Sequence, residues 1–350
     1  MLKIILDCER MKYPHTGLFH FCHQLGLSLK ELTINTETEI TYYIPEKEKV
    51  RFGNESAVMV QNAMHKFLMP SLKGYQIWHS TFQGTNYFPA SQKIKKVLTV
   101  HDLNFMYDEN KSLYKKNRAL RKLEQKIKMA DAVVTISNFV LNDLKQHIAF
   151  DYTKAHVIYN GCNFSEYSQP KAPQHSPLSP FLYTIGTITE KKNFHVLPAL
   201  LKTFDGLLII SGITQNEAYK EKIIKEARRH HVEDRLVFTG PITEGEKMWY
   251  MQHCEAFVFP SISEGFGLPV VEAMYLGTPV ILSRYTSLPE IGGDAAFYFD
   301  SFEPEVIGGV LINCLSQNKR SILKTDLINR ANQFNWKDAS IQYLKLYNSL

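Results

Sequence analysis

The sequence has few of the features that mark several large protein classes. It contains only five cysteines and no CxxC pair, which argues against a disulfide framework or a zinc site and favours a reducing compartment. No apolar run approaches the roughly 20 residues that cross a bilayer. The opening MLKIILDCERMKY reads as a buried first strand rather than a signal peptide. No strand-like run leads into GxGxxG, which disfavours a nicotinamide-dependent oxidoreductase. We therefore expect a cytoplasmic protein that at most rests on a membrane face.

The net charge of +5 is modest, but basic residues gather in one segment. Residues 111–128 carry eight Lys or Arg side chains against the single acidic Glu124. Apolar residues recur there at helical spacing, which predicts a basic amphipathic helix; they are Leu113, Leu120, Leu123 and Ile127. Two interpretations stay open: a solvated helix that covers a sheet, and a surface for anionic lipid or a lipid-phosphate acceptor on the inner membrane, where each basic group contributes ~1 kcal/mol. We expect no nucleic-acid partner.

The chain of 350 residues exceeds what one hydrophobic core usually organises. Apolar β-rich runs alternate with helical stretches, which predicts an α/β fold with doubly wound parallel sheets. In the first half we expect helices at about 17–32, 112–130 and 137–147, and strands at 3–7, 40–44, 57–61, 77–80, 96–101, 132–136 and 156–160. In the second half we expect strands at 181–186, 207–212, 235–240, 256–261, 279–283 and 295–299.

A break between two domains is predicted at residues 168–180. Four prolines in this segment cannot sustain a helix or a central strand, so it reads as a linker between domains at 1–167 and 181–333. Three strands of the second domain end directly in a glycine, and a glycine at that edge lets the backbone approach a ligand; the three are Gly186, Gly212 and Gly240. We expect a cleft between the two domains.

The most informative segment is 256–294. An apolar strand leads into a loop with Glu264, and Pro269 and Gly277 suit the first position and the end of the helix that follows. Glu264 is expected just before this helix and Glu272 in its first turn. A helix N-terminus offers unpaired N–H groups and partial positive charge, which favours an anion site. The two carboxylates would accept hydrogen bonds from sugar and ribose hydroxyls while the N–H groups hold phosphate; the alternative is a surface helix with two solvated glutamates.

The Glu-x7-Glu spacing within SEGFGLPVVEAM resembles the donor-site motif of family 4 glycosyltransferases of the GT-B fold. The GTPV and LPEIGGDAA that follow are similar to that family as well. Further landmarks resemble it in family order: TVHDLNFMY, AVVTIS, VIYNGCN, YTIGTITEKKN, RLVFTG and FNWKDASIQYLKLY. The resemblance implies two Rossmann-like domains that face a central cleft, with a final helix at 334–350 crossing back to the first domain.

The resemblance also implies roles for residues of the second domain. Glu264 and Lys192 would be catalytic: Glu264 takes the hydroxyls of the transferred sugar, and Lys192 neutralises the diphosphate. Lys191 stands where the family commonly has Arg, which keeps the charge but loses the bidentate fork. Glu272 would bind the ribose diol. The remaining expected donor contacts come from strand-end and loop positions: Gly186, Thr187, Gly240, Phe266, Gly267 and Leu268.

Two residues of the first domain complete the predicted site. His101 follows an apolar strand and precedes Asp102, and the resemblance gives it a contact with the transferred sugar as a third catalytic residue. Gly17 matches the glycine loop of the family near the diphosphate and acceptor. Leu18, Phe19 and His20 replace the fuller pattern that often follows, so Gly17 as an ordinary helix-starting glycine stays open.

The resemblance to this family implies a hexosyltransferase that retains anomeric configuration. We expect no cofactor and no metal, since the chain has no Asp-x-Asp motif, and the departing phosphate would take the acceptor proton. Segment 256–294 looks most like bacterial mannosyltransferase-type members of the family. This likeness favours a GDP-sugar such as GDP-mannose as donor and a glycan or lipid-linked glycan of bacterial surface polysaccharide, such as lipopolysaccharide, as acceptor. UDP-sugars, a GT-B sugar-nucleotide epimerase and a non-catalytic binding module remain alternatives.

Overall fold

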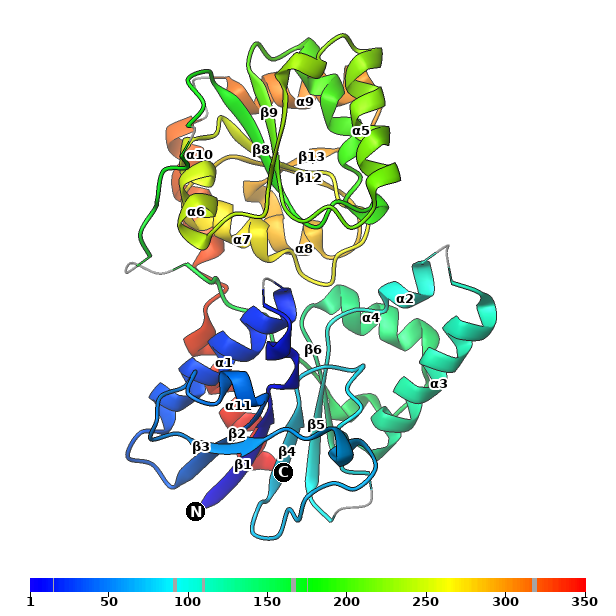
Figure 1. Cartoon of the computed structure of the whole chain (residues 1–350), viewed down its shortest axis with the longest axis vertical. Coiled ribbons are helices and arrows are strands. Elements are labelled where there is room, and N and C mark those ends of the chain that lie inside the picture. The colour runs from blue at the N-terminus through cyan, green and yellow to red at the C-terminus, as the bar shows by residue number, and fades with distance from the viewer. Residues whose placement is uncertain (15, 91–92, 109–110, 165–167, 175, 317–319) are drawn as a thin grey trace. The chain divides into compact units, whose positions relative to one another are not determined.

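The computed structural model describes residues 1–350 apart from 15, 91–92, 109–110, 165–167, 175 and 317–319. The chain divides into two compact units, of which the first contains Met1–Asn163 and Phe334–Leu350 and the second contains Phe164–Gln333 (Figure 1). The division groups the proline-rich segment 168–180 with the second unit. Residue 175 of that segment lies outside the described residues.

The first unit is built on a parallel seven-stranded sheet of order β3-β2-β1-β4-β5-β6-β7. The order changes direction between the neighbours β1 and β4, which is where open α/β sheets bind ligands outside the carboxyl ends of their strands. All seven strands lie where the apolar runs predict them, although β7 is shorter. They are β1 (Leu2–Asp7), β2 (Thr38–Ile44), β3 (Ala57–Val60), β4 (Ile77–Ser80), β5 (Lys95–Val100), β6 (Ala132–Thr135) and β7 (Ala155–Val157).

The three predicted helices of this unit begin at hydroxyl side chains that cap them. Thr16 Oγ1 accepts from the N–H of Phe19 at the start of α1, and Ser112 and Ser137 cap α3 and α4. The helices of the unit are α1 (Gly17–Thr33), α2 (Asn104–Tyr107), α3 (Leu113–Met129), α4 (Asn138–His147) and α11 (Trp336–Ser349). Its short 3-10 turns are η1 (Glu9–Lys12), η2 (Glu46–Glu48), η3 (Ala63–Lys66) and η4 (Tyr152–Lys154).

The final helix α11 packs on α1 within the first unit (Figure 1). Ser28 Oγ of α1 donates to the carbonyl of Trp336 at 3.0 Å. On the sheet, the fully buried His79 bonds through Nδ1 to the Tyr347 hydroxyl and through Nε2 to Thr99 Oγ1, each at 2.7 Å. Burial, with a smaller effect of His101, lowers the pKa of His79 to about 3, so its imidazole is neutral at ordinary pH.

This buried imidazole predicts an acid-sensitive fold. Below the ordinary pKa of 6.5, His79 takes up a proton in the unfolded chain but not in the folded one. As the pH is lowered, the free energy of unfolding therefore decreases by about 1.4 kcal/mol per pH unit for each such histidine. His101, whose pKa is lowered to about 4, acts in the same direction. Asp7 has the opposite effect, because its raised pKa lets the folded chain hold a proton between pH 3.8 and about 7 that the unfolded chain releases. In that range Asp7 cancels the contribution of one of the two histidines. Urea unfolding at pH 7.5 and 5.0 should show a shallower pH slope for His79→Gln; equal slopes would contradict the prediction.

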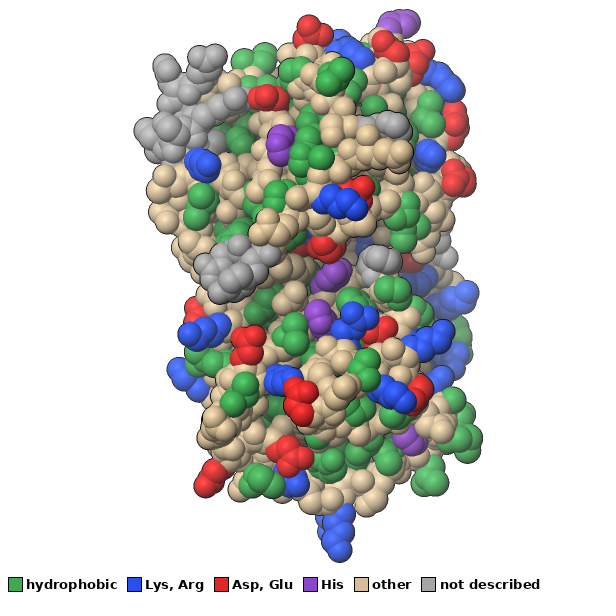
Figure 2. Space-filling view, turned by 60° about the vertical axis from the view of Figure 1, so that its left-hand side comes forward, with side chains coloured by type: hydrophobic (Ala, Val, Ile, Leu, Met, Phe, Trp, Pro, Cys, Tyr) green, Lys and Arg blue, Asp and Glu red, His purple; other side chains and the backbone are tan. Residues whose placement is uncertain are grey.

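The basic helix α3 forms as predicted, but its apolar residues do not all face the sheet. Leu123 and Ile127 are buried, whereas Leu113 is 70% exposed, so the four apolar residues do not form one packed face. Tyr114 beside it is 71% exposed. On the face drawn in Figure 2, acidic and basic side chains are interspersed. Among the described residues no helix is both long and apolar enough to span a membrane.

The second unit carries a parallel six-stranded sheet of order β10-β9-β8-β11-β12-β13. All six predicted strands form: β8 (Phe181–Ile185), β9 (Leu207–Ser211), β10 (Leu236–Gly240), β11 (Ala256–Phe259), β12 (Val280–Ser283) and β13 (Phe297–Phe299). The α-helices are α5 (Glu217–Arg229), α6 (Glu244–His253), α7 (Leu268–Tyr275), α8 (Leu288–Gly292), α9 (Pro304–Leu315) and α10 (Arg320–Ala331). The 3-10 segments are η5 (Glu190–Lys192), η6 (Phe194–Lys202), η7 (Glu233–Arg235) and η8 (Gly293–Ala295).

Candidate active site

Gly186 and Gly212 directly follow β8 and β9, and Gly240 is the last residue of β10, so the three glycines lie in a row at the carboxyl ends of neighbouring strands. The N–H of Gly186 donates to the Ser211 carbonyl at 3.0 Å, and the N–H of Gly212 donates to the Gly240 carbonyl at 2.9 Å. All three have positive φ, of +156°, +131° and +72° in chain order. A Cβ at Gly212 would lie 2.1 Å from the Gly186 carbonyl oxygen, so only glycine fits there.

Lys192 lies directly over Gly186. A Cβ at Gly186 would come within 2.9 Å of Lys192 Cε, so the absent side chain leaves the space that the lysine stem occupies. Lys192 Nζ donates to Glu264 Oε1 at 2.5 Å and lies 4.8 Å from the centre of the Phe259 ring. The side chains of Lys192 and Glu264 are only 11% and 15% exposed. The structure thus brings together three predicted site residues from the ends of the neighbouring strands β8 and β11.

The loops that carry this ion pair are tied to each other. The N–H of Ile262 donates to the Lys191 carbonyl at 2.9 Å, and Ser261 Oγ lies 3.0 Å from the same carbonyl and 2.7 Å from Glu264 Oε1. The Lys191 side chain is exposed. Backbone and hydroxyl contacts therefore fix where the Lys192 ammonium and the Glu264 carboxylate lie.

A second set of contacts holds the loop against the residues before α8. The N–H of Glu264 donates to Thr286 Oγ1 at 3.1 Å, and Ser287 Oγ lies 2.9 Å from the Phe266 carbonyl and 3.1 Å from the Glu264 carbonyl. Gly267 begins α7 as its N-cap residue with φ +110°. The N–H groups of Gly267 and Leu268 precede the helical ladder, which begins where Val270 donates to the Gly267 carbonyl.

The start of α7 differs in detail from the prediction. The helix begins at Leu268, so Pro269 takes the second position rather than the first. Glu272 is the fifth residue and lies in the second turn, because the loop continues as far as Gly267. Gly277 follows the end of the helix with φ +70°, as predicted.

Glu272 is directed into the second unit. It is 1% exposed, and its two oxygens lie 3.0 and 2.9 Å from Lys247 Nζ of α6. The alternative of two solvated glutamates on a surface helix is therefore wrong, since neither Glu264 nor Glu272 is freely exposed. A binding role of Glu272 toward ribose stays a prediction.

In the first unit, His101 follows β5 and is 8% exposed. Its Nε2 donates to the Thr81 carbonyl at 2.7 Å, and its N–H donates to Gln83 Oε1 at 3.1 Å. Burial is the main reason why its pKa is lowered to about 4. Because a carbonyl only accepts, Nε2 carries the proton and Nδ1 of the neutral ring is an acceptor. Such a ring can accept a bond from a hydroxyl.

Asp102, which follows His101 in the chain, and the predicted residue Gly17 show simpler surroundings. Asp102 Oδ1 accepts from the N–H of Asn104 at 3.0 Å, at the start of α2. Gly17 is the first residue of α1, is exposed, and has no atom within 4 Å of the position of a Cβ. Sterics alone therefore do not require glycine at this position.

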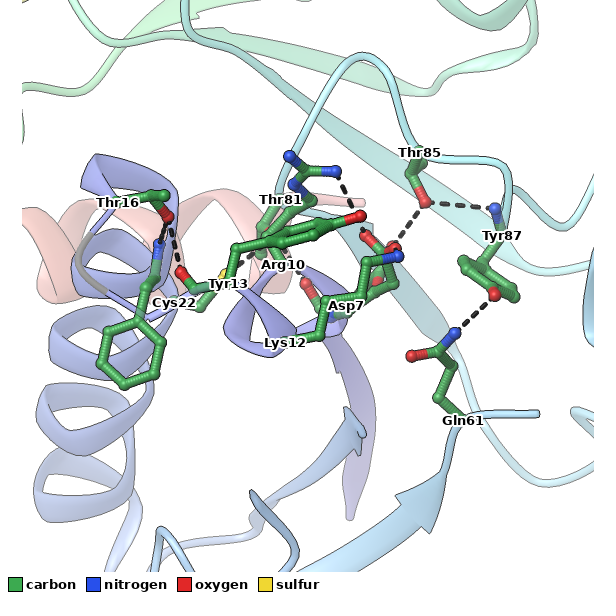
Figure 3. Close-up of polar contacts among 12 residues, drawn as sticks. Asp7, Arg10, Lys12, Tyr13, Thr16, Cys22, Gln61, Thr81, Thr85 and Tyr87 are labelled. Carbon is green, nitrogen blue, oxygen red and sulfur yellow. Dashed lines mark hydrogen bonds and ion pairs between the residues drawn. The ribbon is translucent and has the colours of Figure 1, made fainter. Parts of the chain in front are cut away.

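A polar network around Asp7, at the end of β1, was missed by the sequence reasoning (Figure 3). Asp7 is buried and accepts from the Glu9 N–H and from Thr85 Oγ1, each at 3.1 Å. The Thr81 hydroxyl donates to its backbone carbonyl. Burial raises the pKa of Asp7 to about 7. An aspartate directly after an apolar strand was the signal available in the sequence.

Lys126 of α3 belongs to the same neighbourhood. Its ammonium donates to the backbone carbonyls of Gln83, at 2.8 Å, and Thr85. Burial lowers its pKa to about 8, against the opposing charge of Asp7. One of the eight basic side chains of the segment is thus turned inward and supports the loop that holds His101.

Among the described residues no group of three or more His, Cys, Asp and Glu side chains is arranged to hold a metal ion. The expectation that no metal takes part stays a prediction. In the part of the second unit that the structure describes, the Lys192–Glu264 ion pair lies on the loops beside Gly186, and the start of α7 adds the partial positive charge of a helix N-terminus.

Known proteins resemble the chain over both units. The family model "Glycosyltransferase Family 4" matches residues 21–166, and "Glycosyl transferases group 1" matches residues 168–334. O-antigen chain mannosyltransferase B of Escherichia coli is 24% identical, with the full length of both chains covered.

Two solved structures share the fold. Sucrose-phosphate synthase from Thermosynechococcus elongatus has a TM-score of 0.78 at 17% identity and covers 100% of this chain and 99% of its own. Anabaena Alr3699/HepE in complex with UDP and glucose has a TM-score of 0.76 at 17% identity, with 100% of both chains covered. These matches confirm the predicted fold class and the predicted enzyme class, a glycosyltransferase of the hexosyltransferase type. The chain belongs to the family 4, group 1 glycosyltransferases of the GT-B fold.

Proposed function

We propose that this enzyme transfers a hexose, with retention of configuration, from a nucleotide-sugar to a glycan or lipid-linked glycan acceptor in bacterial surface polysaccharide synthesis. The observation that carries the proposal is the Lys192–Glu264 pair beside Gly186 and the start of α7. Similarity over the full length to an O-antigen chain mannosyltransferase favours mannose from GDP-mannose. The neighbour in complex with UDP and glucose keeps UDP-sugars as the alternative donor class.

In this proposal the second unit stabilises the leaving nucleoside diphosphate. Negative charge grows on the diphosphate as the glycosidic bond breaks, and donors fixed in advance give the largest catalytic effect. Lys192 has three N–H donors, so it can contact the diphosphate while it keeps its bond to Glu264. The N–H groups of Gly267 and Leu268 supply further donors at a helix start.

The Glu264 carboxylate accepts hydrogen bonds from hydroxyls of the transferred sugar. Lys192 and Ser261 hold this carboxylate in place. The acceptor hydroxyl attacks the face from which the diphosphate departs, and the departing phosphate takes the proton. No side chain forms a bond to the sugar. Mass spectrometry that trapped a glycosyl adduct on Glu264 would contradict this step.

The remaining contacts follow from position. Gly186, Thr187 and Gly240 bring backbone to the carboxyl ends of β8 and β10, where the diphosphate and the base would lie. In the first unit, Nδ1 of His101 accepts a hydrogen bond from a hydroxyl of the transferred sugar. Gly17 allows the diphosphate and acceptor to approach the start of α1.

The test is an assay of the purified chain with GDP-mannose and with UDP-glucose, with and without an extract of lipid-linked glycan. We expect sugar transfer that needs the extract, and thermal stabilisation by GDP or UDP. Conversion of the donor to another nucleotide-sugar without acceptor would instead indicate an epimerase. Absence of stabilisation by both nucleotides and of turnover of both donors would overturn the proposal.

We further propose that α3 brings the enzyme to the cytoplasmic face of the inner membrane. Leu113 and Tyr114 are exposed at its start, next to exposed Lys115, Arg118 and Lys122. We expect the chain to sediment with phosphatidylglycerol-containing vesicles but not with pure phosphatidylcholine vesicles. The variant Lys115→Glu/Arg118→Glu should lose about tenfold or more in this affinity, since each basic group contributes ~1 kcal/mol. The matched control Lys220→Glu/Lys225→Glu on α5 should bind as the natural chain does; equal binding by both variants would contradict the proposal.

A further inference from the structure

A buried lysine on α6 contacts the carboxylate that the donor motif contributes from α7. Lys247 is 8% exposed. Its ammonium lies 3.0 and 2.9 Å from the two oxygens of Glu272 and 2.7 Å from Glu244 Oε2. The same ammonium lies 4.9 Å from the centre of the Phe164 ring. All four residues belong to the second unit.

The two partners of Lys247 differ in exposure. The Glu244 side chain is 55% exposed, whereas that of Glu272 is 1% exposed. An exposed carboxylate is hydrated with or without the lysine, while a buried one needs a compensating charge. Removal of Lys247 would therefore change the state of Glu272 far more than that of Glu244.

The contacts also decide the charge state of the pair. Burial alone would lower the pKa of Lys247, but Glu272 and Glu244 outweigh that effect and the pKa is raised above its ordinary value. Lys247 is therefore an ammonium, and it favours the ionised form of Glu272. The ammonium donates to Oε1 of Glu272 and lies 2.9 Å from Oε2, so the ion pair also restrains the rotation of the carboxylate about its last bond.

A ribose diol presents two neighbouring hydroxyl donors, and an ionised carboxylate whose rotation is restrained can accept hydrogen bonds from both. Hydrogen bonds to a charged acceptor are about twice as strong as neutral ones. We propose that Lys247 is a positioning residue of the nucleotide site, which keeps Glu272 ionised and oriented to bind the 2′ and 3′ hydroxyls of the donor ribose. The inference rests on the proposed function, because it takes Glu272 to be the ribose ligand.

A purely structural role is the rival explanation, since Lys247 also ties α6 to α7. The two roles differ in one measurable quantity, the preference for a ribonucleotide over its 2′,3′-dideoxy analogue. Loss of a structural tie weakens the binding of both nucleotides alike. Loss of the positioning role weakens only the binding that uses the hydroxyls.

The experiment measures dissociation constants by calorimetry for GDP, UDP and their 2′,3′-dideoxy analogues with the full chain. For whichever of GDP and UDP binds more tightly, we expect the natural chain to bind the ribonucleotide about tenfold or more tightly than its 2′,3′-dideoxy analogue, as for loss of a hydrogen bond to a charged group. Lys247→Met should reduce this ratio to about twofold or less and change the affinity for the analogue little. Glu244→Gln is the matched control, since it removes the exposed partner, and should keep the ratio.

Lys247→Arg covers the case in which the methionine variant does not fold. It keeps the charge but replaces the compact ammonium with a wider group, so we expect an intermediate ratio at a nearly unchanged Tm. An unchanged ratio in either folded lysine variant would overturn the inference. Failure of the natural chain to bind GDP or UDP would instead reject the proposed function, which separates the two outcomes.

Discussion

Replacement of Lys192 with alanine is expected to lower kcat/KM for the donor by about 10²–10³-fold, the effect of removing one fixed donor from a growing negative charge. Lys192 suits this role because its ammonium is held by Glu264 and its stem lies over Gly186. The side chain is 11% exposed, so water does little to screen it. Its loss also leaves the carboxylate of Glu264 without its nearest cation.

The matched control is Lys191→Ala. Lys191 has the same charge and lies in the same turn, but its side chain is exposed, so we expect a loss of less than about tenfold. Initial rates over a range of donor concentrations, with circular dichroism to verify folding, measure both effects. Equal losses in the two variants would show that general basicity of the turn matters rather than the Lys192–Glu264 contact.

Most strands of both sheets could be predicted because parallel strands buried on both faces leave continuous apolar runs in the sequence. The edge strands β3, β7 and β10 are only partly buried but carry apolar runs as well. The segments that pack on the faces of the first sheet could not all be predicted. One of its faces is packed by residues of irregular segments, with Leu72, Tyr87 and Ile94 meeting Trp78 and Tyr43 of the strands. Such segments have neither the helical nor the strand period, so no pattern in the sequence reveals where they lie.

The same distinction applies to the candidate site. Gly186, Lys192 and Glu264 could be predicted as neighbours, because they follow strands whose carboxyl ends meet at one edge of the sheet. The partners Lys247 and Lys126 could not, since each sits on an amphipathic helix among other charged residues. Whether a helix lysine points to solvent or into the unit depends on the rotation of that helix, which the tertiary contacts decide.

The largest expected effect on stability comes from Gly212→Ala. The new Cβ would lie 2.1 Å from the Gly186 carbonyl oxygen and 2.8 Å from its carbonyl carbon, both backbone atoms within the glycine row. The φ of +131° adds strain for any L side chain. Strain and overpacking together predict a loss of about 2–5 kcal/mol, and the displaced Gly186 backbone should also lower the activity.

The variant Gly240→Ala separates the effect of atomic overlap from the effect of backbone strain. Gly240 also has a positive φ, of +72°, but no atom lies within 4 Å of the position of its Cβ. The variant should therefore lose only the ~1–2 kcal/mol that the left-handed backbone conformation imposes on alanine. Calorimetric Tm values for the two variants and the natural chain measure the difference. An equal fall in Tm for Gly212→Ala and Gly240→Ala would mean that the backbone of β8 moves aside freely, and that the close approach of Gly212 to Gly186 does not hold the Lys192 loop in place.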